Sequence, residues 1–62
     1  MRYYILYSGQ LKMFVRRGMR GFGRLLTYDF QQAKRFSSKE YAEDYRLQMD
    51  DAEIWVVREV IR

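Results

Sequence analysis

The residues best suited to chemistry in this sequence lie in one short basic segment, residues 16–24. Its nine residues include four arginines and three glycines, and they follow neither the period of a helix nor the alternation of a strand, so they predict a loop. Guanidinium groups are costly to bury and bind carboxylates and phosphates well. We therefore expect this loop to contact an acidic partner. The candidate contact residues are Lys12, Arg16, Arg17, Arg20, Phe22 and Arg24.

Two kinds of partner suit such a loop. Several neighbouring cations can neutralise the phosphates of a nucleic acid, while Phe22 or the tyrosines of an adjoining strand stack on unpaired bases. The same arginines can also bind an acidic protein surface. The plain alternative is a solvated loop whose arginine stems cover aromatic rings. The glycines lack the spacing of a Walker loop, which also needs a Lys and a Ser or Thr after its last glycine.

Catalysis and metal binding have weaker support in this sequence. It contains no histidine and no cysteine, which removes the imidazole base, the thiolate nucleophile, any disulfide and the usual ligands of structural zinc. Asp50, Asp51 and Glu53 offer oxygen ligands, but they lack the spacing and the glycine of a calcium-binding loop. We therefore expect no enzymatic activity, no metal ion and no cofactor.

The charge is divided along the chain. Residues 1–39 carry nine lysines and arginines against one acid, whereas residues 40–62 carry three against seven. This division predicts a basic side and an acidic side in the folded protein. No apolar run approaches the roughly 20 residues of a membrane-spanning helix, and the first residues do not have the pattern of a signal peptide. We expect one small cytoplasmic domain over residues 1–62, with no membrane partner.

The elements that must hold the basic loop begin with a hairpin. Residues 2–8 and 11–16 are rich in tyrosine and aliphatic side chains, and a Gly-Gln pair separates them. This pattern predicts two antiparallel strands joined by a two-residue turn, with Ser8 opposite Leu11. The register places one largely apolar set of side chains on the first face of the hairpin. The second face carries Tyr3, Ile5, Tyr7 and Phe14.

The rest of the chain predicts one main helix between two further strands. Residues 25–28 favour a short third strand, and Asp29 with Gln32 favours a helical turn that begins at Asp29. Ser37 and Glu40 predict a second helix start, from which the main helix is expected over residues 38–49. The stripe that this helix buries is expected to contain Tyr41, Ala42, Tyr45 and Met49, leaving solvent to Glu43, Asp44 and Arg46.

Residues 54–61 predict the final strand, because they are mostly β-branched or aromatic. The fold class is therefore α+β, a small antiparallel sheet of three to four strands with one main helix packed on one face.

One helix can cover only one face of this sheet. The opposite face would then expose the second hairpin face, together with Trp55 and Val57 of the last strand. An exposed apolar patch of this size predicts a homodimer or docking as a subunit on another protein. The alternatives are a platform on which bases stack and burial under the basic loop, folded back over the sheet.

The segment over residues 29–42, DFQQAKRFSSKEYA, resembles a pattern frequent in small phage and mobile-element proteins: an N-terminal hairpin, an Ala-Lys-Arg-Phe-like stretch, a capped helix and a closing strand. The chain is also similar, more loosely, to small anti-CRISPR and host-takeover inhibitors. The resemblance spans most of the chain but transfers no functional residue. It implies a non-catalytic protein, in the cytoplasm of a host cell, that inhibits or redirects a host protein or nucleoprotein complex.

Two other functions stay open at this point. The first is a direct, weakly sequence-selective RNA- or DNA-binding module, which the basic loop supports. The second is a purely structural subunit of a larger assembly, which the apolar sheet face supports.

Overall fold

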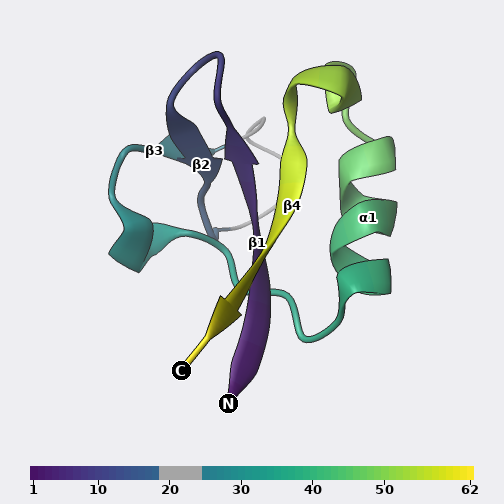
Figure 1. Ribbon diagram of the computed structural model, residues 1–62. Helices are drawn as coiled ribbons and strands as arrows, with labels where there is room; N and C mark the ends of the chain where they lie inside the picture. Colours follow the sequence, from purple (N-terminus) through teal and green to yellow (C-terminus); the bar gives the residue numbers. More distant parts are fainter. Residues whose placement is uncertain (19–24) are drawn as a thin grey trace.

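The protein is a four-stranded antiparallel sheet with one main helix, so the expected α+β class is confirmed (Figure 1). The computed structural model describes residues 1–18 and 25–62. The strand order in the sheet is β3-β2-β1-β4. The elements, in chain order, are β1 (Arg2–Ser8), β2 (Met13–Val15), β3 (Leu26–Thr27), the 3-10 turn η1 (Phe30–Gln32), α1 (Lys39–Leu47), the 3-10 turn η2 (Ala52–Ile54) and β4 (Val56–Ile61).

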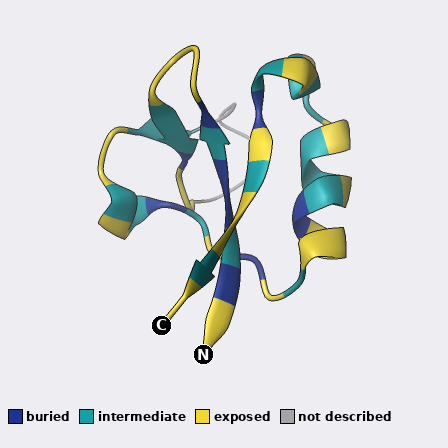
Figure 2. Ribbon diagram, viewed as in Figure 1, coloured by how far each residue is buried: buried dark blue, intermediate teal, exposed yellow. Residues whose placement is uncertain are grey.

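Strand β1 lies in the middle of the fold. It pairs with β4 along its whole length, from Arg2 opposite Ile61 to Tyr7 opposite Val56, and its end pairs with β2. Successive side chains of a strand point to opposite faces, and both faces of β1 enter a core. Figure 2 shows β1 as the most continuously buried element of the sheet.

The first core lies between the sheet and α1. Its fully buried members are Leu6, Val15, Phe36, Ala42 and Trp55. The ring of Phe36 meets the rings of Tyr41 and Tyr45 edge-on, with 5.2 Å between centroids in each case. The indole N–H of Trp55 donates to Asp51 at 3.1 Å, so the only polar atom of this large side chain is satisfied. Truncating a ring such as Phe36 would cost about 3–5 kcal/mol, comparable with the whole stability of so small a domain.

The second core lies on the opposite face of the sheet, and the segment between β3 and α1 builds it. This segment pairs with two strands in turn, because Ala33 bridges to Arg16 after β2 and Phe36 bridges to Tyr4 in β1. The main chains of Phe36 and Tyr4 exchange two hydrogen bonds of 2.8 and 2.9 Å. Turn η1 consequently lies across the sheet from α1 (Figure 1). The second core buries Tyr3, Ile5 and Ala33, with Phe14, Phe30 and Val60 packed around them.

The predicted two-residue hairpin turn is wrong. The loop has four residues, and Ser8 pairs with Met13 rather than Leu11, which shifts the register by two residues. The reason is local: the hydroxyl of the buried Ser8 accepts from the amide of Leu11 at 3.1 Å, and its carbonyl accepts from Lys12 at 2.7 Å. A shift of two leaves every side chain on its expected face, so the predicted division of the hairpin faces survives.

Two other element boundaries differ from the prediction. The hydroxyl of Ser38, not Ser37, accepts from the amide of Tyr41 at 3.1 Å, so α1 begins one residue later than a cap at Ser37 would give. Strand β4 begins at Val56, and Trp55 lies in the helix-side core rather than on the open face. Val57 also packs against that core, so the predicted exposure of Trp55 and Val57 is wrong.

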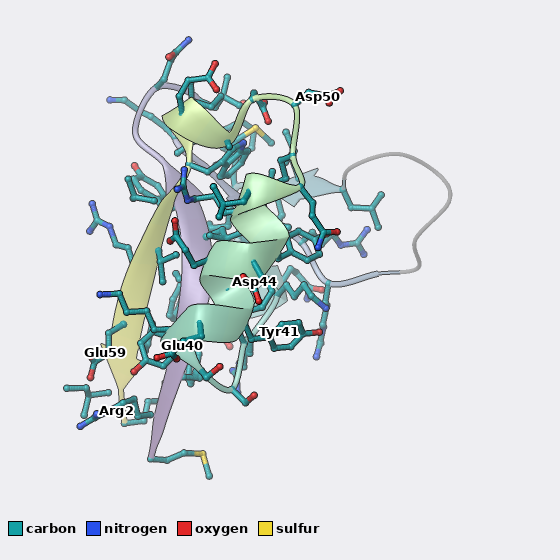
Figure 3. All side chains as sticks on the ribbon, turned by 90° about the vertical axis from the view of Figure 1, so that its right-hand side faces the viewer. Arg2, Glu40, Tyr41, Asp44, Asp50 and Glu59 are labelled. Carbon is teal, nitrogen blue, oxygen red and sulfur yellow. The ribbon has the colours of Figure 1, made fainter. Side chains whose placement is uncertain are left out.

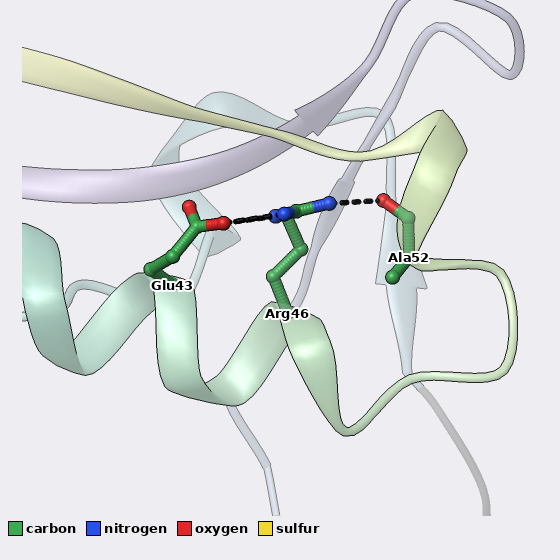
Figure 4. A network of polar contacts seen from close by, with 3 residues as sticks. All are labelled: Glu43, Arg46 and Ala52. Atoms are coloured by element: carbon green, nitrogen blue, oxygen red, sulfur yellow. Dashed lines mark hydrogen bonds and ion pairs between the residues drawn. The ribbon is translucent and has the colours of Figure 1, made fainter.

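Other local predictions are confirmed. Asp29 caps η1, since its carboxylate accepts from the amide of Gln31 at 2.9 Å. Strand β3 lies within the predicted third strand and pairs with β2. Of the three helix residues expected in solvent, only Asp44 is fully exposed, whereas Glu43 and Arg46 are partly buried. Arg46 pairs with Glu43 and donates to the carbonyl of Ala52 at 2.7 Å (Figure 4). This network connects α1 to η2.

Lys12 generates the first prediction, because its φ of 57° lies in the left-handed region that favours glycine. Replacing Lys12 with Gly should raise the free energy of unfolding by about 0.5–1 kcal/mol, the relief of backbone strain exceeding the added entropy of the unfolded chain. Gln10→Gly in the same loop is the control, and it should lower stability, since Gln10 does not have a positive φ. Urea unfolding of both variants checks this. A loss of stability in Lys12→Gly would contradict the loop geometry.

Glu43 generates the second prediction, on pH. The hydrogen bond from Arg46 lowers the pKa of the Glu43 carboxyl below its ordinary value of 4.5. A carboxyl whose pKa is lower in the folded state contributes stability above its ordinary pKa, and that stability is lost as the pH falls through the folded value. The stability lost in Glu43→Gln should therefore be largest near neutral pH and should shrink below pH 4.5. Thermal unfolding across this range measures it, and a constant difference would contradict the Arg46 contact.

Candidate binding surface

The basic segment leaves the sheet from a well-fixed base. The amide of Arg16 donates to the carbonyl of Leu25 at 2.8 Å, and the amide of Arg17 donates to Gln32 at 3.3 Å. Both arginines and Lys12 are exposed, as predicted for contact residues. Within residues 1–18 and 25–62, no carboxylate forms an ion pair with either arginine. The remaining predicted contact residues, Arg20, Phe22 and Arg24, lie outside the described residues.

Of the four residues predicted to form an open sheet face, only two remain partly exposed. Tyr3 and Ile5 are 7% and 3% exposed, because η1 and Ala33 cover them. The expectation that they form an open docking surface is therefore wrong. The alternative in which the basic loop folds back over this face concerns residues 19–24, which lie outside the described residues, whereas the described cover is η1 with Ala33. Tyr7 and Phe14 are different. They are only partly buried, although Phe30 of η1 packs beside Phe14.

Tyr7 and Phe14 line a groove of about 410 Å³ on this face. Their rings lie 5.2 Å apart, and the ring of Phe30 continues the row at 5.7 Å from Phe14. The groove therefore has a wall of three rings that come from β1, β2 and η1. Its complete lining is Ile5, Tyr7, Phe14, Phe30, Arg58, Glu59 and Val60.

Guanidinium groups lie over the rings of this face. The Arg58 guanidinium carbon is 4.9 Å from the centre of the Tyr7 ring, and that of Arg62 is 5.9 Å from the centre of Phe30. On the covered half of the face, Arg35 lies 4.6 Å from the centre of Tyr3. Cations at these distances are attracted to the negative ring faces. The surface is thus both aromatic and basic.

Sequence reasoning missed these three arginines. Arg58 reaches Tyr7 because β4 pairs with β1, in a register that sets it opposite Ile5 on the same face. The sequence of β4 gave no indication of which strand it would pair with. The usable signal was the parity of Arg58 and Val60 along β4, which separates them from Val57 on the helix side.

The acids of the fold are mostly elsewhere. Figure 3 views the molecule from the α1 side, where Glu40 and Asp44 extend from the exposed surface of the helix and Asp50 lies in the loop after it. Glu59 lines the groove, but its carboxylate pairs with Arg2 at 2.9 Å. The predicted acidic side thus corresponds to α1 and the loop that follows it. The rings and guanidinium groups of the groove lie on the other face of the sheet.

The described residues do not form a metal site. In the part of the chain that the structure describes, no three acidic side chains come together as metal ligands would. No helix among these residues has the length and apolar character needed to cross a membrane.

Comparison of the chain with protein-family models, with curated proteins and with solved structures found no match.

Proposed function

We propose that this chain is a non-catalytic binding protein that inhibits or redirects a host protein or nucleoprotein complex, and that its basic segment is the contact. That the target belongs to a host follows from the resemblance to small phage proteins alone. The binding mode is occlusion, in which arginines on a rigid base enter a site that otherwise receives an anion.

The observation that carries this proposal is the state of Arg16 and Arg17. Their main chains are fixed by hydrogen bonds to Leu25 and Gln32, whereas their side chains are exposed and have no carboxylate partner among the described residues. Two adjacent, exposed guanidinium groups with no carboxylate partner among the described residues support contact with an external anion, because Arg presents several donors in a planar geometry.

The division of charge supports the same proposal. Since the exposed surface of α1 carries Glu40 and Asp44, a polyanion approaching that side is repelled. It is attracted where Arg16 and Arg17 leave the sheet. The protein would therefore bind an acidic target in one orientation, with the basic segment toward the target.

The third prediction tests the basic segment with a charge-matched pair of variants. Arg16→Ala/Arg17→Ala and the control Arg2→Gln/Lys39→Gln each remove two exposed cations. If the contact is local, the first variant should elute from a heparin column at distinctly lower salt than the control, because a clustered pair of phosphate-binding groups contributes more than net charge does. Capture from host lysate should show the same order, with the target retained by the control and lost by the Arg16/Arg17 variant.

Equal elution of the two variants would show that only net charge matters, which contradicts the proposal. Equal capture of the same proteins by both would contradict it as well. Circular dichroism of both variants confirms that the sheet is intact before either result is read.

A further inference from the structure

The uncovered half of the sheet face is a second surface, with residues that the basic segment does not include. Its rings come from three separate elements and form a continuous row from Tyr7 through Phe14 to Phe30. Val56, which is opposite Tyr7 in the register, is 48% exposed and extends the same surface. A chain this short would be expected to cover such a row if it served only as core.

We propose that this groove binds unpaired nucleotides of a single-stranded nucleic acid, with bases against Phe14 and its neighbouring rings and phosphates on Arg58 and Arg62. This inference goes beyond the proposed function, since it concerns different residues and can fail while the basic segment still binds its target.

The chemistry of the groove fits both parts of a nucleotide. A base is planar and apolar on its faces, and it stacks on aromatic side chains whatever its sequence. The guanidinium carbons of Arg58 and Arg62 lie 4.9 and 5.9 Å from ring centres, and the N–H groups of a guanidinium can bind phosphate oxygens. Rings and cations thus lie together on one surface, as base and phosphate do in each nucleotide of a single strand.

Size and charge favour the same ligand. A groove of about 410 Å³ is within the range of sites that hold small organic ligands, which begins at roughly 300 Å³. Glu59 is the one acidic residue in the lining, but strand alternation places its side chain on the α1 side with that of Val57, where it pairs with Arg2. An anionic ligand would therefore meet uncompensated positive charge from Arg58 and no unpaired acid among the lining residues.

An acidic protein segment fits this surface less well. Its carboxylates could satisfy Arg58 and Arg62, but they would leave the row of rings without a partner. Every nucleotide of a single strand supplies a planar group for the rings as well as a charge for the arginines. The observations therefore favour nucleic acid, and the acidic peptide becomes an outcome of the test.

The fourth prediction uses labelled oligouridine and oligodeoxythymidine as probes, with binding followed by fluorescence anisotropy at several salt concentrations. Phe14→Leu keeps an apolar side chain but removes the ring, and it should weaken binding about 5- to 100-fold, the effect of losing one stacked base. Arg58→Gln should reduce the slope of log affinity against log salt by about 0.7, the share of one phosphate contact in a single strand.

Two matched variants control for general effects. Tyr28→Leu removes a ring that is 75% exposed and does not line the groove, and Lys39→Gln removes an exposed cation on α1. Both should bind the probes as the unchanged chain does. If the 2′-hydroxyl contributes to recognition, oligouridine will bind more tightly than oligodeoxythymidine; equal affinity assigns recognition to base and phosphate alone. Either result supports the proposal, whereas tighter binding to a duplex of the same length would overturn it.

The proposal is also overturned if neither probe binds at physiological salt, if Phe14→Leu binds as tightly as the unchanged chain, or if oligoglutamate displaces the probe as effectively as oligouridine. Should Phe14→Leu fail to fold, amide chemical shifts of the unchanged chain during the titration decide the matter. Shifts at Tyr7, Phe14 and Arg58 support the groove. Shifts confined to Arg16 and Arg17 overturn it and leave the proposed function standing.

Discussion

The fold depends on one strand being buried from both sides. Leu6 of β1 belongs to the core under α1, and its neighbour Ile5 belongs to the core under η1. Strand β1 is also hydrogen-bonded on both edges, to β4 on one side and to β2 and Phe36 on the other. A domain of this size buries only about 60% of the surface that its unfolded chain exposes. Using one strand to serve two cores is how this chain obtains enough apolar burial.

This arrangement has an unequal result on the two faces. A helix of nine residues covers one face, whereas a three-residue 3-10 turn and the chain after it cover part of the other. The covering segment buries Tyr3 and Ile5 but leaves Tyr7 and Phe14 only partly buried. The groove is therefore a direct consequence of how little chain is available for the second layer. The basic segment begins beside it, since Arg16 follows Phe14 by two residues.

The sequence predicts the faces of the hairpin but not its register. Strand parity was enough to divide the hairpin faces correctly, because a register error of two residues does not change the side on which a residue lies. The register itself depended on the hydroxyl of Ser8 and the left-handed Lys12, which a turn rule based on glycine does not include. Two serines in succession made the helix cap ambiguous by one residue, and Ser38 rather than Ser37 is used.

The larger errors came from tertiary pairing, which local pattern does not contain. Nothing in residues 33–36 indicates that they bridge first to Arg16 and then to Tyr4, yet this crossing is what buries Tyr3 and Ile5. Likewise, Arg58 becomes part of the groove only because β4 pairs with β1. The sequence thus predicts that the candidate surface is basic and aromatic. It identifies Tyr7 and Phe14 as part of this surface but not Arg58.

The groove requires that the sheet face opposite α1 be buried at Tyr3 and Ile5 but partly exposed at Tyr7 and Phe14. The most direct measurement is the attenuation of side-chain proton signals by a soluble gadolinium chelate in the free protein. The side-chain proton signals of Tyr7 and Phe14 should be attenuated strongly, and those of Tyr3 and Ile5 only a little. Equal attenuation of all four would show that η1 does not cover the face. Protection of Tyr7 and Phe14 in the free protein would show that their half of the sheet face is also buried. Either result would contradict a groove at this position.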